Sequence, residues 1–234
     1  SIFSEAWFVK KVLRAKYVYT KSNLEWDNHP WNWQAKSNLS DAIISISRAT
    51  DELLEKHGYR DKIRTIYLGI DTEQFKRDLS ARYSLRSQLE QPADAFVFGC
   101  AAQLVEWKEH LTLIDAFERV AEEHASAHLV FCGFHREDAY YRTFRERIEG
   151  SPFSSRIRYL GTVDNMPAFY SSLDCFVLPS RFETFGYVYI EGMSCGLPVI
   201  ACNAAGPLDI VEPGNSGLLV GISNPDELAR AMKS

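Results

Sequence analysis

Short apolar runs alternate along the chain with segments whose apolar positions recur every three or four residues. Runs such as Ala42–Ile46 and Cys175–Leu178 are almost wholly apolar, which is typical of strands buried in a parallel sheet. Leu113, Phe117 and Val120 recur at helical spacing, which predicts a helix with one face on a sheet. The alternation predicts an α/β fold with helices on both faces of parallel sheets. The predicted strands are residues 17–20, 42–46, 63–68, 96–100, 129–132, 157–160, 175–178, 199–201 and 218–220.

Two domains are predicted, because the alternation is interrupted once. Residues 71 to about 95 are rich in charge and poor in long apolar runs, which favours a linker or a domain crossing. The six strands predicted after this segment suffice for a complete Rossmann-like domain in residues 76–234, whereas residues 1–75 hold only the tail of another α/β domain. Because the chain opens with Ser1 and ends in a predicted helix, we expect it to be part of a longer protein.

Charge and cysteine content exclude several classes of function. A formal net charge of −5 argues against a general nucleic-acid binder, which normally carries a basic surface. No apolar run approaches the ~20 residues that span a bilayer. The five cysteines include no Cys-x-x-Cys pair, which argues against a zinc or redox site and favours reduced thiols in the cytoplasm.

The segment after the predicted strand at 175–178 carries the strongest candidate chemistry. Ligands of open α/β sheets bind at the carboxyl ends of the strands, and a helix is predicted to start near Gly186. The amides of Thr184, Phe185 and Gly186 would then form an anion site at the helix N-terminus. Glu183 lies beside them, and Glu191 follows eight positions later, about two helical turns. From these residues alone, Glu191 as a solvated helix residue and Glu183 as an acid favoured by the helix dipole remain equally open.

This stretch closely resembles the Glu-x7-Glu signature of glycosyltransferase family 4, which comprises retaining enzymes with the two-domain GT-B fold. The resemblance covers roughly residues 40–230, including Gly69–Asp71 with Phe75, where the family crosses between its domains. Single motifs are weak, but their order makes the set specific. Further matching segments are residues 163–170, 173–180, 196–201 and 215–220.

The resemblance implies a role for each matching residue. Glu191 would hold the ribose hydroxyls of a nucleotide, and Glu183 would contact the donor sugar, because its carboxylate would repel an adjacent phosphate. Lys108 would neutralise the leaving diphosphate, with the amides of Thr184, Phe185 and Gly186 around the diphosphate or sugar. Three further donor-binding residues are Gly133, where backbone approaches the ligand, and Asn165 and Met166, which would border the base.

Two positions depart from the family pattern. The family usually has Arg where this chain has Gln103, and Gly where it has Glu109. Gln103 can contact the donor but supplies no charge, so stabilisation of the phosphates would depend more heavily on Lys108. A lone lysine beside Trp107 can also be an ordinary surface residue with a packed stem, which is the alternative at this position.

These matches predict transfer of a sugar from a nucleoside-diphosphate sugar to a hydroxyl of a sugar, lipid-linked or glycan acceptor, with retention. No Asp-x-Asp pair occurs, so we expect no metal, and no cofactor besides the donor substrate. This chain alone should be inactive or weakly active, because the acceptor side is built by the first domain. The alternatives are a nucleotide-sugar epimerase of the same fold and a non-catalytic sugar-nucleotide-binding protein.

Two other segments invite functional interpretations. Gly192–Gly196 fits the G-x-S-x-G pattern of hydrolases, but Ser194 is predicted late in a helix instead of on a strand-to-helix turn, so we reject a nucleophile elbow. The segments Trp7–Arg14 and Trp26–Trp33 would pack inside the first domain, with an acceptor wall or peripheral contact with the cytoplasmic face of a membrane as alternatives.

Overall fold

The computed structural model describes residues 2–23 and 30–234 and divides into two compact units. The first unit comprises Ser1–Gly69 and the second Ile70–Ser234. The sequence placed the domain boundary after residue 75. The second unit also includes Phe75, which packs against its hydrophobic core and accepts a hydrogen bond from the Ser194 hydroxyl.

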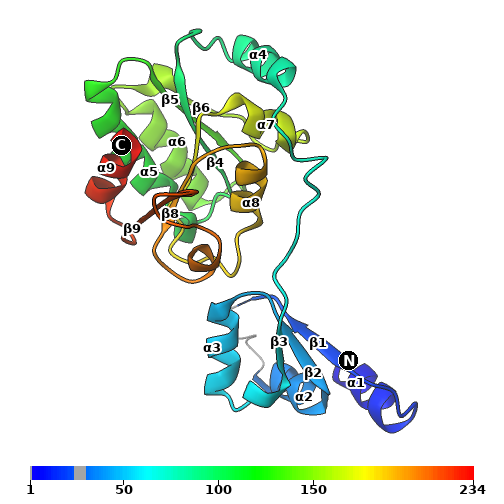
Figure 1. Cartoon of the computed structure of the whole chain (residues 1–234). Helices are drawn as coiled ribbons and strands as arrows, with labels where there is room; N and C mark the ends of the chain where they lie inside the picture. Colours follow the sequence, from blue (N-terminus) through cyan, green and yellow to red (C-terminus); the bar gives the residue numbers. More distant parts are fainter. Residues whose placement is uncertain (1, 24–29) are drawn as a thin grey trace. The chain divides into compact units, whose positions relative to one another are not determined.

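In its described residues, the first unit is a small parallel sheet with three α-helices (Figure 1). Its strand order is β1-β2-β3, and the helix after β2 is capped by Ser47, whose hydroxyl accepts the amide of Thr50. The third strand ends earlier than predicted: the amide of Ile66 still donates to Ser45 of β2, but Ile66 and Tyr67 are about half exposed. The elements are α1 (Ile2–Lys11), β1 (Val18–Lys21), α2 (Pro30–Leu39), β2 (Ala42–Ser45), α3 (Arg48–Lys56) and β3 (Ile63–Thr65).

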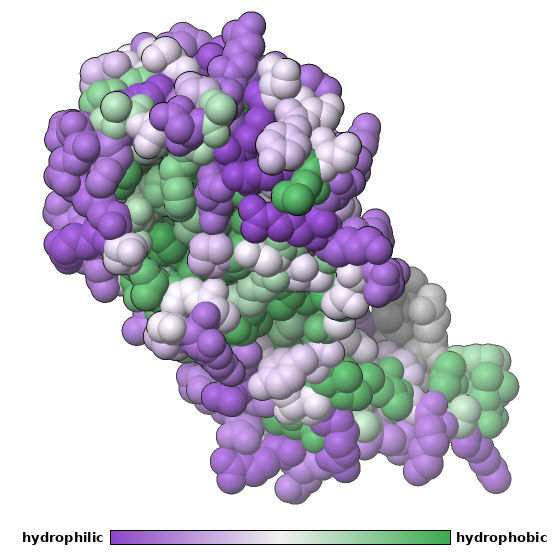
Figure 2. Space-filling model, turned by 45° about the horizontal axis from the view of Figure 1, so that its top comes forward, coloured by the Kyte–Doolittle hydropathy of each residue, from purple (hydrophilic) through white to green (hydrophobic). Residues whose placement is uncertain are grey.

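Apolar side chains are exposed around α1, at the lower right of Figure 2. Trp7, Phe8, Val12 and Leu13 are all about half exposed. No helix in the described part of the chain is long and apolar enough to cross a membrane. The predicted membrane contact of this region stays a prediction. Residues 26–29 of the tryptophan-rich segment Trp26–Trp33 lie outside the described residues, and the rest of it belongs to α2, which begins at Pro30.

The second unit is built on the six-stranded parallel sheet that the apolar runs predicted (Figure 1). Its strand order is β6-β5-β4-β7-β8-β9, so the chain winds outward from β4 in one direction and then from β7 in the other. All five strand pairs are parallel, which brings the carboxyl ends of the strands to one edge. The strands are β4 (Phe96–Ala101), β5 (Ala127–Cys132), β6 (Ile157–Tyr159), β7 (Cys175–Leu178), β8 (Val199–Cys202) and β9 (Gly217–Val220).

Two groups of helices accompany this sheet. Contacts join α5 to α6 and α9 in one group, and α7 to α4 and α8 in the other. The buried core between these layers includes fully buried aromatic side chains, among them Phe117 from α5, Tyr170 from α7 and Tyr189 from α8. The helices are α4 (Leu79–Gln88), α5 (His110–Glu123), α6 (Ala139–Glu149), α7 (Met166–Ser172), α8 (Tyr187–Ser194) and α9 (Pro225–Lys233).

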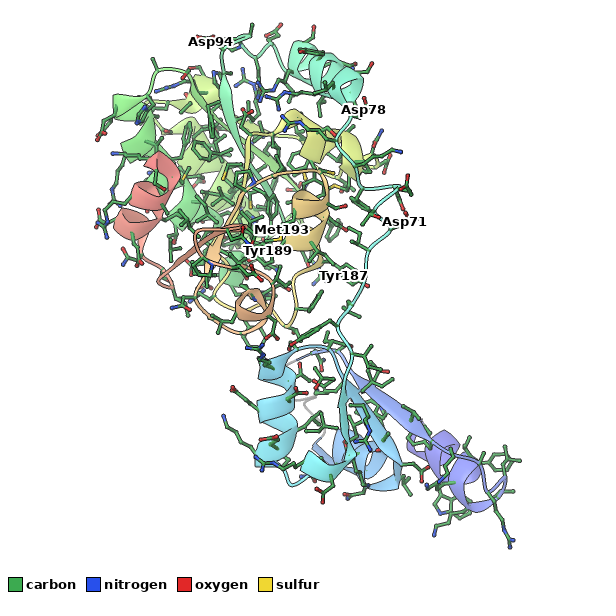
Figure 3. The ribbon with its side chains drawn as sticks, in the orientation of Figure 1. Asp71, Asp78, Asp94, Tyr187, Tyr189 and Met193 are labelled. Carbon is green, nitrogen blue, oxygen red and sulfur yellow. The ribbon has the colours of Figure 1, made fainter. Side chains whose placement is uncertain are left out.

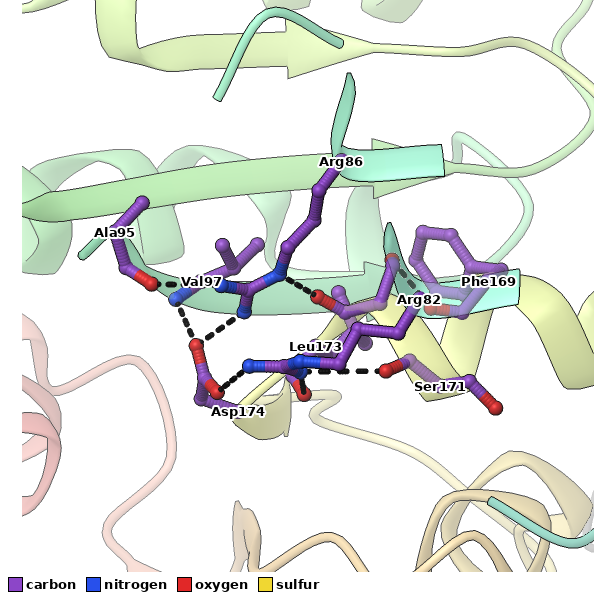
Figure 4. Close-up of polar contacts among 9 residues, drawn as sticks. Arg82, Arg86, Ala95, Val97, Phe169, Ser171, Leu173 and Asp174 are labelled. Carbon is purple, nitrogen blue, oxygen red and sulfur yellow. Dashed lines mark hydrogen bonds and ion pairs between the residues drawn. The ribbon is translucent and has the colours of Figure 1, made fainter. Parts of the chain in front are cut away.

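The linker predicted between residues 71 and about 95 is shorter than expected, because α4 lies within it. Two of its charged residues, Arg82 and Arg86, each approach a different oxygen of Asp174 to 2.5 Å (Figure 4). The amide of Val97, at the start of β4, donates to the same carboxylate at 2.7 Å. Burial raises the pKa of Asp174, but this amide and the two guanidinium groups outweigh it and hold the pKa below its usual value. These charges therefore fasten α4 to the sheet.

Candidate functional site

The sheet order creates a switch point between β4 and β7. From these neighbouring strands the chain leaves toward opposite edges of the sheet, which is where open α/β sheets form their ligand crevice. The loop after β4 carries Lys108, in a short 3₁₀ helix at Glu106–Lys108. The loop after β7 carries Glu183. Both residues singled out for catalysis therefore lie at the switch point.

The structure brings Lys108 and Glu183 into direct contact. The Lys108 ammonium forms an ion pair with Glu183 Oε2, and each side chain is more than four-fifths buried. The Lys108 amide donates to the carbonyl of Val105, which fixes the local turn. Two residues that the resemblance assigned to different parts of a donor are thus paired with each other. A ligand that uses both charges must separate them.

Lys108 supplies the positive charge of its loop. His110 begins α5 directly after the loop and is almost fully buried. Burial, followed by the charge of Lys108, lowers the pKa of His110 to about 3. Its imidazole is therefore neutral near pH 7, and its Nδ1 lies 3.3 Å from the hydroxyl of Tyr140. His110 therefore adds no positive charge to that of Lys108.

The loop from Glu183 to Gly186 leads into α8 as the sequence predicted. Gly186 caps the helix with φ +105°, and a Cβ there would lie 2.3 Å from the ring of Tyr189, so the position needs glycine. Tyr189 is buried and donates its hydroxyl to the carbonyl of Leu178, whereas Tyr187 is exposed (Figure 3). The buried tyrosine thus fixes the start of α8 against the end of β7.

The amides predicted to bind an anion lie at this helix start. Within the described part of the chain, the structure records no acceptor for the amides of Thr184 and Gly186. Phe185 is buried, and Thr184 is partly buried. Helix N-terminal amides carry partial positive charge. The amides of Thr184 and Gly186 are therefore candidates for binding an anion, and the role of all three amides in binding stays a prediction.

Glu191 accepts a hydrogen bond from a buried tyrosine that the sequence analysis did not assign to the site. The hydroxyl of Tyr170 donates to Glu191 Oε2 at 2.6 Å, and Tyr170 itself is fully buried on α7. Burial raises the pKa of Tyr170 well above its usual value, and the negative charge of Glu191 raises it further. The tyrosine therefore stays protonated and occupies one carboxylate oxygen. This contact argues against the interpretation of Glu191 as a freely solvated helix residue.

Gly133 and Gln103 lie together at the carboxyl ends of β5 and β4. Gly133 has φ +146°, and a Cβ there would lie 1.8 Å from the carbonyl oxygen of Ala102, so the adjacent strand end already requires glycine. The Gly133 amide donates to Gly161, and its carbonyl accepts the hydroxyl of Tyr159. The side chain of Gln103 is exposed beside this junction.

The two remaining predicted residues lie at the start of α7. Asn165 caps that helix through its side-chain oxygen, which accepts the amide of Ala168 at 3.1 Å. Met166 is partly buried against the core. No contact recorded among the described residues joins Asn165 or Met166 to the Lys108–Glu183 pair, so their place beside a base stays a prediction. Ser194 ends α8, which agrees with the rejection of a nucleophile elbow.

A further loop, after β8, packs on the site and carried no signal in the sequence analysis. The amide of Gly206 donates to the carbonyl of Glu183 at 2.9 Å. A Cβ on Gly206 would lie 2.4–2.7 Å from the backbone of Phe185, so only glycine permits this approach. Ala205, just before it, has φ +51° and ψ −129°, a conformation that favours glycine. Backbone strain is thus stored beside the predicted anion site.

Replacing Ala205 with glycine should raise the free energy of unfolding by about 1 kcal/mol, because it relieves this conformation. Urea denaturation would measure the change. Ala204→Gly is a suitable control, since Ala204 is not among the residues with positive φ, and it should be neutral or destabilising. An Ala205→Gly variant less stable than the unchanged chain would contradict the strain at this position.

Among residues 2–23 and 30–234, no group of three His, Cys, Asp or Glu side chains is arranged to hold a metal ion. The predicted independence of metal stays a prediction. The fold and the residues at the switch point define the class of protein: a Rossmann-like α/β protein with a lysine–glutamate pair at the switch point of its parallel sheet.

Comparison with known proteins identifies the family. Residues 95–234 match the family described as "Glycosyl transferases group 1", and residues 3–74 match "Glycosyltransferase Family 4". The first match alone covers more than half of the chain, which therefore belongs to the group 1 glycosyl transferases. The family and the GT-B fold predicted from the sequence are confirmed.

Individual relatives agree with this assignment. The chain is 30% identical over 173 residues to the GDP-mannose-dependent alpha-(1-6)-phosphatidylinositol monomannoside mannosyltransferase of Mycobacterium tuberculosis, covering 70% of this chain and 44% of that protein. It is 30% identical over 203 residues to the D-inositol 3-phosphate glycosyltransferase of Acidothermus cellulolyticus, covering 77% and 42%. The chain thus spans less than half the length of these relatives.

Solved structures show the same fold. HepE of Anabaena, crystallised in complex with UDP, matches with a TM-score of 0.90 and 26% identity over 99% of this chain and 65% of that one. A glycosyltransferase of Rickettsia africae matches with a TM-score of 0.86 at 20% identity, covering 97% of this chain and 62% of that one. The HepE complex shows that a protein of this fold binds a nucleoside diphosphate.

Proposed function

We propose that the protein containing this chain transfers a sugar from a nucleoside-diphosphate sugar to an acceptor hydroxyl. The observation that carries the proposal is the Lys108–Glu183 pair at the switch point, beside the amides that start α8. A cation and helix amides suit a diphosphate, and a carboxylate beside them suits a sugar ring. The nucleotide-bound structure of HepE supports the same class of donor.

Each residue has a distinct task in this proposal. Glu191, steadied by Tyr170, accepts hydrogen bonds from the ribose hydroxyls. Lys108 moves from Glu183 to the diphosphate when the donor binds. Its positive charge stabilises the leaving group most strongly as the glycosidic bond breaks, because negative charge grows on the diphosphate at that point. The released Glu183 carboxylate then faces the sugar, whose ring gains positive character. Retention of configuration is part of the proposal and rests on the family resemblance.

Two alternatives differ in their products. An epimerase of the same fold would release free nucleotide or an altered sugar without any acceptor, and a non-catalytic binder would leave the donor intact. The names of the relatives favour transfer, since they describe transferases that act on a phosphatidylinositol mannoside or on inositol phosphate. We accordingly propose a hydroxyl of a sugar, lipid-linked or glycan molecule as the acceptor.

Binding can be tested on this chain, because the proposed donor contacts lie within its second unit. UDP, GDP or ADP should raise the melting temperature, since a ligand at 100 times its Kd stabilises a protein by about 2.7 kcal/mol. Calorimetry with the preferred diphosphate should then show that Glu191→Ala weakens binding by about 1.5–3 kcal/mol, the range for a hydrogen bond to a charged group.

Glu212→Ala is a matched control, because Glu212 is an exposed carboxylate after β8 whose bonds stay within its own loop. It should bind the nucleotide like the unchanged chain. Labelled donor with the complete protein would then separate transfer from epimerisation. Absence of binding by all three diphosphates, or equal affinity of the Glu191→Ala variant, would contradict the proposed donor site.

A further inference from the structure

A buried carboxylate lies next to Lys108 at a position whose backbone favours glycine. Glu109 has φ +59° and ψ +35°, the left-handed region, and it both ends the 3₁₀ turn that carries Lys108 and caps α5. Its side chain is only 9% exposed. A left-handed conformation is unfavourable for a residue with a side chain, compared with the right-handed one. Glycine would adopt this backbone conformation without strain, so the backbone alone does not explain why glutamate occupies the position.

The Glu109 carboxylate joins the loops that follow three strands. Its Oε1 lies 2.6 Å from Nε of Arg181, in the loop after β7, and accepts the hydroxyl of Ser223, after β9, at 2.9 Å. Its Oε2 accepts the hydroxyl of Thr112 in the first turn of α5. Both oxygens are therefore occupied by groups of the chain. A buried carboxylate bound in this way restrains the parts that it joins.

The spacing of these residues links the restraint to the candidate site. Glu109 directly follows Lys108, and Arg181 comes two residues before Glu183. The Arg181 amide donates to the carbonyl of Trp107 at 2.8 Å, which adds a backbone bond between the same two loops. The Glu109–Arg181 ion pair therefore joins the same two loops as the Lys108–Glu183 ion pair.

We propose that Glu109 is a positioning residue for Lys108, acting through its ion pair with Arg181. The inference rests on the proposed function and adds a residue to it. When a donor draws Lys108 away from Glu183, their own pair no longer holds the two loops together. The Glu109–Arg181 pair keeps the loops in register, so that Lys108 meets the diphosphate where charge develops. Misplacement by about 1 Å can cost ~100-fold in rate while ground-state binding changes little.

The informative variant is Glu109→Gly, because glycine fits the positive φ and the chain should remain folded. In the complete protein, release of UDP from UDP-glucose or GDP from GDP-mannose gives kcat and KM without an identified acceptor. We expect kcat to fall by roughly 10-fold or more, the donor KM to change by less than about 3-fold, and the melting temperature to stay or rise. A purely structural role would instead lower the melting temperature.

Two further measurements separate positioning from a general loss. Lys108→Met should cost much less in the Glu109→Gly background than in the unchanged protein, since residues that act through one another are not additive. Glu106→Gln is the matched control, because Glu106 also contacts Arg181, at 3.0 Å, but its side chain is 77% exposed. It should leave kcat and KM within about 2-fold.

A Glu109→Gly variant with unchanged kcat would overturn the inference, as would losses from Glu109→Gly and Lys108→Met that simply multiply. Failure of the proposed function gives a different result. In that case the unchanged protein would neither bind UDP or GDP nor release them from their sugars, and the role of Glu109 would fall with it.

Discussion

Replacing Asp174 with alanine should destabilise the second unit by about 3–5 kcal/mol, the range measured when one partner of a buried ion pair is removed. Asp174 lies just before β7, forms ion pairs with Arg82 and Arg86, and accepts a hydrogen bond from the amide of Val97. The guanidinium of Arg86 would keep its bonds to two carbonyls, of Ser172 and Ala95, but would lose its counter-charge. The amide of Val97 would lose its acceptor at the start of the central strand.

Urea denaturation of the chain, followed by tryptophan fluorescence and circular dichroism, would measure this loss. Asp226→Ala is the matched control, because Asp226 pairs with Arg119 at 3.1 Å but is 69% exposed, and an exposed pair contributes at most about 1 kcal/mol. The pKa of Asp174 is held below its usual value in the folded chain. The stabilisation is therefore present above the pKa that Asp174 has in the unfolded chain, and it is lost as the pH falls through its lower pKa in the folded chain. A loss below about 1 kcal/mol would contradict this account of how α4 is fastened.

The sheet of the second unit could be predicted from the sequence because its strands are local apolar runs. Both faces of a parallel strand are buried, so Cys175–Leu178 and Val199–Cys202 contain hardly any polar residue. Helix caps are equally local: the side chain of Asn224 caps α9 by accepting the amide of Glu227, only three residues further along the chain. Prediction failed where a feature depends on contacts between residues that are far apart in the sequence. The partners that make α4 a packed helix, Arg86 and Asp174, are 88 residues apart.

The candidate site likewise has features that the sequence predicts and features that only the folded chain shows. The rule for strand ends, together with the family resemblance, placed Lys108 and Glu183 at one crevice, but not in contact, since their pairing joins side chains 75 residues apart. Tyr170 gave no signal, because a buried aromatic residue on a helix has the pattern of ordinary core until its hydroxyl is found on Glu191. Glu109 was noticed only as a departure from the family. Its burial and its bonds to Arg181 and Ser223 are properties of the folded chain.

Glu183→Gln should lower the kcat of sugar transfer by roughly 100-fold or more and, at the same time, tighten binding of the free nucleoside diphosphate. The first effect follows because a carboxylate facing the sugar stabilises positive charge that develops only in the transition state. The second follows because Glu183 holds Lys108 in an ion pair, and the neutral amide releases the ammonium to the diphosphate. The direction of this shift therefore tests the ion pair that the structure shows.

The experiment pairs donor turnover by the complete protein with calorimetry of UDP and GDP on the Glu183→Gln, Lys108→Met and doubly substituted chains. The gain in affinity from Glu183→Gln should vanish when Lys108 is methionine, because the gain is made by that ammonium. A gain that persists without Lys108 would assign it to relief of repulsion between Glu183 and the phosphates. Near-normal kcat in the Glu183→Gln variant would be a different outcome. A charge that aids the reaction cannot be removed without lowering kcat, so this outcome would exclude such a role for the Glu183 carboxylate. Glu183 would then act only as the counter-ion that orders Lys108 before the donor binds.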